Sequence, residues 1–105
     1  MEIIETEMFT KRIVGMLSDD EYKDLQWTLI ANPTAGRVIS GGNGLRKLRW
    51  AITGRGKSGG LRIIYYCFMQ LEKIYMIFSY RKSEQEDLTK AQLKILINYV
   101  KEGVL

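Results

Sequence analysis

Residues 61–80 read LRIIYYCFMQLEKIYMIFSY, two runs of β-branched and aromatic residues separated by a short interruption. Residues of these types favour strands, so the pattern predicts one strand over residues 61–69 and a second over residues 73–80. Gln70-Leu71-Glu72 is short enough to form the turn between them. The stretch therefore predicts an antiparallel hairpin.

The segments before this hairpin predict two more strands. Residues 44–52 alternate basic and apolar side chains and predict a strand, which a glycine-rich basic loop over residues 53–60 connects to the hairpin. Residues 2–9 predict a short strand at the start of the chain. Residues 33–43 are rich in glycine and small residues, so we expect a loop there.

Two capping boxes, each a hydroxyl followed three residues later by Glu or Gln, mark helix starts at Ser18–Glu21 and Thr89–Gln92. The first of these helices should end at Asn32-Pro33, because a residue before proline avoids the helical region. The second should end near Gly103. Residues 10–16 are expected to add one or two helical turns.

The predicted order is β-α-α-β-β-β-α, in a single domain spanning residues 1–105. Successive strands with short connections should pair antiparallel, so we expect an α+β fold in which helices pack on one face of a small antiparallel sheet. No apolar run is long enough to cross a bilayer, and the acidic start of the chain does not resemble a signal peptide. We therefore expect a cytoplasmic protein with no membrane partner.

The chain has no histidine and one cysteine, Cys67. The lack of histidine excludes His-based acid–base chemistry and most zinc sites, and we expect no metal or other cofactor. Cys67 lies in an apolar run and is expected to be buried. A single cysteine cannot form a disulfide within the chain, which fits a reducing compartment.

Charge is distributed unevenly along the chain. The net charge is +4, yet residues 25–71 contain no Asp or Glu and hold the cations Arg37, Arg46, Lys47, Arg49, Arg55, Lys57 and Arg62. Such a block favours a polyanionic partner, which could be RNA, DNA, an anionic membrane surface or an acidic protein. The alternative is that solvated cations keep the sheet soluble and its edge unpaired.

Strand alternation places Lys47 and Arg49 on one face of the predicted strand over residues 44–52 and Leu48 and Trp50 on the other, which is the better core face. Arg62 begins the next strand, so a regular hairpin should bring it near the far end of residues 44–52. Three cations on one sheet face repel each other unless an anion or solvent lies among them. A phosphate group is the obvious anion.

Three motifs resemble a known family: GLRKLR at residues 44–49, GxGKxGGxRxIYY at residues 54–66 and YxKxExxDL at residues 80–88. Together they resemble the HigB-type toxins of the RelE/ParE superfamily over nearly the whole chain. The resemblance implies a RelE-like fold and a toxin–antitoxin component. Its RelE-like relatives are ribosome-dependent endonucleases that cut mRNA without a metal, and the chemistry expected here is attack by the RNA 2′-OH.

The partners that the resemblance implies are a HigA-like antitoxin, the ribosome and mRNA. The superfamily also contains ParE-like members that act on DNA gyrase. A non-enzymatic toxin or nucleic-acid-binding module of that kind is therefore the alternative function.

The resemblance also implies candidate catalytic residues, Lys47, Arg49, Arg62 and Lys82, and Tyr80 is a possible substitute for the C-terminal tyrosine of some RelE proteins. Arginine rarely gives up its proton, so Arg49 and Arg62 suit stabilisation of a charged transition state. A lysine crowded by cations can have a lowered pKa, so Lys47 or Lys82 is the candidate base. We expect further RNA contacts from the neighbouring cations Arg46, Arg55, Lys57 and Arg81.

Overall fold

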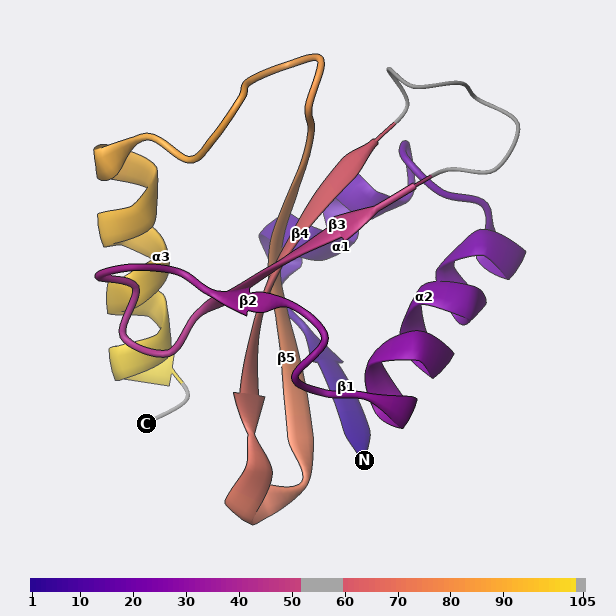
Figure 1. Cartoon of the computed structure of the whole chain (residues 1–105), viewed down its shortest axis with the longest axis horizontal. Helices are drawn as coiled ribbons and strands as arrows, with labels where there is room; N and C mark the ends of the chain where they lie inside the picture. Colours follow the sequence, from indigo (N-terminus) through magenta and orange to yellow (C-terminus); the bar gives the residue numbers. More distant parts are fainter. Residues whose placement is uncertain (52–59, 104–105) are drawn as a thin grey trace.

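The computed structural model describes residues 1–51 and 60–103, which form one five-stranded sheet flanked by helices (Figure 1). The α+β class is confirmed. The described residues contain no helix long and apolar enough to span a bilayer.

The sheet order is β1-β5-β4-β3-β2. Along the chain the elements are β1 (Glu2–Glu5), α1 (Glu7–Ile13), α2 (Asp19–Ala31), β2 (Arg37–Val38), β3 (Arg46–Trp50), β4 (Leu61–Phe68), the 3-10 turn η2 (Met69–Leu71), β5 (Lys73–Arg81) and α3 (Lys90–Gly103).

The predicted hairpin is confirmed: β4 and β5 pair antiparallel along the whole of β4, and η2 forms the turn between them. The register shifts between Ile64 and Tyr65, which pair with Phe78 and Met76. Ile77 is therefore an extra residue on β5, a β-bulge. The bulge turns Ile77 to the face of the sheet on which Ile64 is buried, since both belong to one core cluster.

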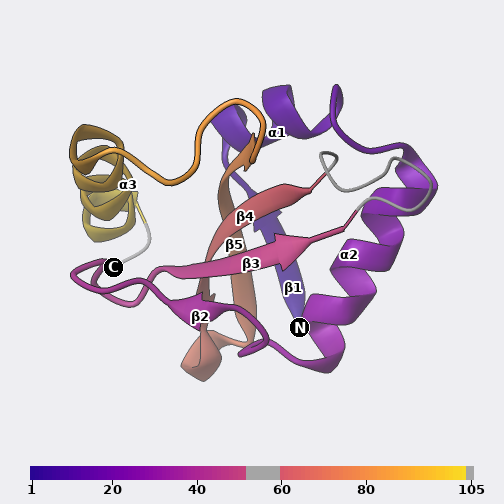
Figure 2. The same cartoon turned by 45° about the horizontal axis from the view of Figure 1, so that its top comes forward.

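Both faces of the hairpin are apolar, and helices cover both (Figure 2). α1 and α2 pack on one face, where Phe9 and Leu25 meet Ile63. α3 packs on the other, where Leu96 and Val100 belong to the cluster of Ile64 and Ile77. The position of α3 thus differs from the expectation of helices on one face. The physical reason is that β4 and β5, central in the sheet, present large apolar side chains to both sides.

The first strand is shorter than predicted, because it ends at Glu5 and Thr6 becomes the N-cap of α1. The Thr6 hydroxyl accepts the Phe9 N–H at 3.0 Å and donates to the Ile77 carbonyl at 2.7 Å. The bulge removes Ile77 from the ladder with β4, so this hydroxyl satisfies a buried carbonyl. β1 pairs parallel with β5 and is one edge of the sheet.

Both predicted capping boxes are present. The Ser18 hydroxyl accepts the Glu21 N–H at 3.2 Å, and the Glu21 carboxylate accepts the Ser18 N–H at 2.8 Å. Thr89 and Gln92 form the same reciprocal pair at 3.0 and 2.9 Å. The second box fixes where α3 begins. We call residues 82–89, which link the end of β5 to the start of α3, the connecting segment.

The region 33–43, predicted to be a loop, contains the short strand β2, which pairs with β3. Tyr65 holds the chain ahead of β2. Its hydroxyl accepts the Gly36 N–H and donates to the Pro33 carbonyl, both at 2.8 Å. A Cβ on Gly36 would lie only 2.7 Å from Cε1 of Tyr65, so glycine is required for this close approach. The contact fixes the position of Arg37, the first residue of β2.

Replacing Tyr65 with phenylalanine tests this contact. The substitution leaves the Gly36 N–H and the Pro33 carbonyl without their partner, and an unsatisfied buried group costs about 1–3 kcal/mol. We expect Tyr65→Phe to lower the free energy of unfolding by about that amount in urea denaturation, with an unchanged m-value. Tyr66→Phe is the matched control, because none of the hydrogen bonds between described residues involves the Tyr66 hydroxyl. An equal loss in both variants would contradict the assignment.

Candidate functional site

Two arginines and a tyrosine form a row across the three central strands. Arg49 lies directly opposite Arg62 between β3 and β4, and Arg62 lies directly opposite Tyr80 between β4 and β5. Directly opposed residues of an antiparallel pair share a face, with Cβ atoms about 4.5–5.5 Å apart. The register thus brings Arg62 to the far end of β3, as the sequence predicted.

A second row crosses β3 at Lys47, two residues before Arg49. Arg37 of β2 lies opposite Lys47, which lies opposite Ile64. Because residues two apart on a strand share a face, Arg37 and Lys47 lie on the same side of the sheet as Arg49 and Arg62. We call these four cations the basic surface. A hollow of about 350 Å³ lies beside β2 and β3, lined by Ala35, Arg37, Lys47, Leu48 and Arg49.

The basic surface lies on the face of the sheet that α3 also uses. α3 covers the part of this face around Ile64 and Ile77, and the connecting segment links the end of β5 to the start of α3 (Figure 1). A neighbouring hollow of about 330 Å³ joins the two regions, lined by Arg37, Val38, Ile39, Ser40, Lys47, Asp87, Leu88 and Leu93.

Arg62 is the most buried cation of the basic surface, with 9% of its surface exposed. Its Nη1 donates to the Leu61 carbonyl at 3.2 Å. Among the described residues it forms no ion pair, and neither do Arg37 or Arg49. A buried charge without a counter-charge is costly, so this arginine favours an anion brought by a ligand.

Lys47 and Tyr80 converge on one carboxylate, that of Asp87 in the connecting segment. Asp87 Oδ1 accepts from Lys47 Nζ at 3.1 Å and from the Tyr80 hydroxyl at 3.5 Å, the long limit for a hydrogen bond. The Leu88 N–H, donating to the same oxygen at 2.8 Å, and then Lys47 hold the pKa of Asp87 below its usual range. Asp87 is therefore ionised at neutral pH.

Tyr80 is buried beside Arg62 and Asp87. Burial, followed by the Asp87 carboxylate, raises the pKa of Tyr80 to about 12, although the Arg62 guanidinium acts in the opposite direction. The phenol is consequently protonated at neutral pH, which suits a donor of a hydrogen bond or a proton and not a base.

Two predicted RNA contacts lie on the other side of the sheet. Arg46 is opposite Tyr65, and its guanidinium donates to the Gly36 carbonyl at 2.8 Å. Arg81 donates to the Gly15 carbonyl at 2.7 Å. The structure does not bring either of them to the basic surface, because residues adjacent in a strand point to opposite faces.

Of the other predicted site residues, the structure describes Lys82. Lys82, one residue beyond the end of β5, is exposed. Its backbone N–H donates to the Gly60 carbonyl at 3.1 Å. Arg55 and Lys57 lie outside the described residues. Within residues 1–51 and 60–103, no three Cys, Asp or Glu side chains are grouped to hold a metal ion.

Comparison with known protein families matches residues 5–103 to the RelE toxin of the RelE/RelB toxin–antitoxin system. The chain belongs to the RelE toxin family. It is therefore the toxin of a toxin–antitoxin system, and its family pairs with an antitoxin. The HigB subtype within the superfamily stays a prediction.

Two residues at the candidate site were not predicted from the sequence as site residues. Arg37 stood in a segment predicted to be a loop, and a two-residue strand leaves no periodic pattern to detect. Asp87 lies 40 residues from Lys47 along the chain. The resemblance included it in a motif, but no sequence signal indicated that it would meet the basic surface.

The raised pKa of Tyr80 can be tested by following tyrosinate absorbance with rising pH. Tyr80→Phe should remove a component that titrates near pH 12, the value to which burial raises this phenol. Asp87→Asn should shift that component to lower pH, because it removes a negative charge that disfavours tyrosinate. A Tyr80 component at the pH of an ordinary exposed tyrosine would contradict this environment.

The connecting segment has a second anchor at Glu84, whose carboxylate accepts two bonds from Arg12 Nη2 at 3.1 Å and one from the Arg81 N–H at 2.9 Å. The pKa of Glu84 is lowered chiefly by the hydrogen bond from the Arg81 N–H, and Arg12 lowers it further. The stabilisation is therefore present above the ordinary glutamate pKa of about 4.3 and is lost as pH falls through the lower folded-state value.

Glu84→Gln should consequently be less stable than the wild type at neutral pH. The side chains of Arg12 and Glu84 are 33% and 39% exposed, so the deficit should be below about 1 kcal/mol. In urea unfolding at a series of pH values, the two proteins should converge under acidic conditions. Glu86→Gln, which removes the same charge two residues away, should follow the wild type throughout. A deficit that persists at low pH would refute the linkage.

Proposed function

We propose that this RelE-family toxin is a ribosome-dependent mRNA endonuclease that inhibits translation by cutting RNA through its own 2′-OH. The observation that carries the proposal is the row Arg49–Arg62–Tyr80, in which a buried arginine has no carboxylate partner among the described residues. Single-stranded RNA fits this site better than duplex DNA, because the hollow beside Arg49 is small, at about 350 Å³.

The arginines supply electrostatic stabilisation. Attack of the 2′-oxygen on phosphorus adds negative charge to the phosphoryl oxygens in the transition state. Arg62 and Arg49, opposed across two strands, can donate to two of those oxygens from fixed positions. Because Arg62 is held by packing, little reorganisation is needed as the charge develops.

The role of Tyr80 follows from its protonation, and the roles of the lysines follow from their positions and contacts. The Tyr80 phenol, protonated and opposite Arg62, is proposed to donate a proton to the leaving 5′-oxygen. Lys47 forms an ion pair with Asp87, so it suits charge stabilisation. Lys82, exposed just beyond β5, remains the candidate base for the 2′-OH.

The cognate antitoxin is proposed to be HigA-like and to neutralise the toxin by covering the basic surface or packing against a helix. Both the ribosome and this antitoxin are met in the cytoplasm, which is the proposed site of action. Arg55 and Lys57, which lie outside the described residues, are proposed as ribosomal RNA contacts because of their charge.

The test is to induce the toxin in bacteria and map 5′ ends on a translated and an untranslated copy of one message. The proposal expects cuts in the translated copy alone. On purified ribosomes, a message with a single 2′-deoxy residue at the cut position should resist cleavage there, because the nucleophile is missing. Cleavage of that message at an unchanged rate would overturn the 2′-OH mechanism.

Arg49→Ala is the variant of choice, because Arg49 is exposed and its loss should not disturb folding. Removing one donor to a developing oxyanion costs about 10²–10³-fold in rate, and we expect a loss of that order in single-turnover cleavage on ribosomes. Lys23→Ala, which removes an exposed cation from α2 on the opposite face, should cleave like the wild type. Equal activity of all three proteins would remove Arg49 from the mechanism.

The same mapping distinguishes the alternative function. Growth arrest with intact messages, accompanied by inhibition of DNA supercoiling, would favour a ParE-like action on DNA gyrase over RNA cleavage.

A further inference from the structure

Asp87 places a negative charge at the basic surface itself. Its Oδ1 contacts Lys47 Nζ at 3.1 Å and the Tyr80 hydroxyl at 3.5 Å, two groups that the proposed function assigns to RNA. Among the described residues, Lys47 is the one member of the basic surface with a carboxylate partner. The carboxylate thus takes the kind of contact that a phosphate oxygen would make.

This contact is exposed and replaceable. The Asp87 side chain is 68% exposed, and that of Lys47 is 27% exposed. Exposed ion pairs contribute about 0.2–1 kcal/mol, whereas a phosphate offers Lys47 and Tyr80 several acceptor oxygens and more charge. An incoming phosphate can therefore displace the carboxylate at small energetic cost.

Other contacts hold the connecting segment in place. Glu84 ties its start to Arg12 and to Arg81. Near its end, the Gln85 side-chain amide donates to the Asp87 carbonyl and to Gln92, each at 2.8 Å. Asp87 stays close to the basic surface whether or not it contacts Lys47, so its carboxylate has a high effective concentration there.

Resting on the proposed function, we propose that Asp87 is an internal anion that competes with an RNA phosphate for Lys47 and Tyr80 and thereby limits the affinity of the toxin for RNA. Binding of RNA exchanges the Lys47–Asp87 ion pair for a Lys47–phosphate pair. Asp87 then turns to solvent, which it already largely faces.

The test measures affinity, not cleavage. A short, labelled, single-stranded RNA with 2′-O-methyl groups, which cannot be cut through its 2′-oxygens, is titrated with the full-length toxin over a series of salt concentrations. Asp87→Asn is the informative variant, because the amide oxygen can still accept the Leu88 N–H that Asp87 accepts at 2.8 Å. The substitution therefore removes the charge while keeping the local backbone contact.

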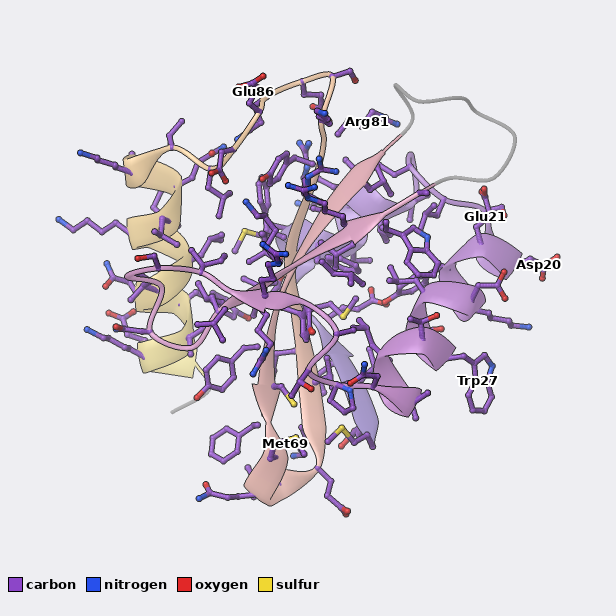
Figure 3. All side chains as sticks on the ribbon, in the orientation of Figure 1. Asp20, Glu21, Trp27, Met69, Arg81 and Glu86 are labelled. Atoms are coloured by element: carbon purple, nitrogen blue, oxygen red, sulfur yellow. The ribbon has the colours of Figure 1, made fainter. Side chains whose placement is uncertain are left out.

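Asp87→Asn should bind this RNA several-fold more tightly at low salt. It should also steepen the fall of log K with log salt by up to about 0.7, the contribution of one phosphate contact on a single strand. The matched control is Glu86→Gln, which removes the same charge from the outer edge of the connecting segment (Figure 3). It should change affinity much less. In a Lys47→Gln background, Asp87→Asn should have little further effect.

Three results would overturn the inference: weaker binding by Asp87→Asn, an unchanged salt slope, or equal gains for Asp87→Asn and Glu86→Gln. Weaker binding would mean that Asp87 positions Lys47 and Tyr80 for RNA, and equal gains would mean a nonspecific charge effect. If the wild type cuts translated messages and binds RNA while one of these results holds, this inference alone fails. A wild type that neither cuts nor binds RNA overturns the proposed function as well.

Discussion

The antiparallel pairing of β4 with β5 is the interaction on which the other parts of the structure depend, because these two strands are central in the sheet and apolar on both faces. A sheet of that kind needs a cover on each side. α1 and α2 cover one face, and α3 covers part of the other. The remainder of that second face carries the basic surface, so the site occupies the region of the sheet that α3 leaves open.

The bulge at Ile77 links this packing to the position of the helices. It adds an apolar side chain to the α3 side and frees a carbonyl that the Thr6 hydroxyl satisfies from the start of α1. Past the end of β1, the open edge of β5 is covered by Arg12, whose Nε donates to the Ser79 carbonyl at 2.6 Å. Arg12 in turn binds Glu84, and so a helix on one face of the sheet helps to position the connecting segment near the other.

Charge and packing oppose each other at the site. Arg62 is buried next to Tyr80 with no carboxylate partner among the described residues, which is unfavourable in the free protein and favourable once an anion binds. The apolar side chains packed on both faces of β4 offset the free-energy cost of burying Arg62. The Asp87 carboxylate reduces the repulsion between Lys47 and the other cations of the basic surface. Because it occupies Lys47, it is proposed to compete with an RNA phosphate for that ammonium group.

Local sequence determined the β4–β5 hairpin, β3, the two capped helices and the face on which Lys47 and Arg49 lie, because alternation and capping depend on residues a few positions apart. It did not indicate that Arg46 and Arg81 would donate to backbone carbonyls on the far side of the sheet. Nor did it indicate that Arg37 lies in a strand or that Asp87, 40 residues from Lys47, would enter a region whose own sequence contains no acid. Those positions depend on which strands become neighbours and where α3 packs, and only the burial of apolar surface across the whole chain decides them.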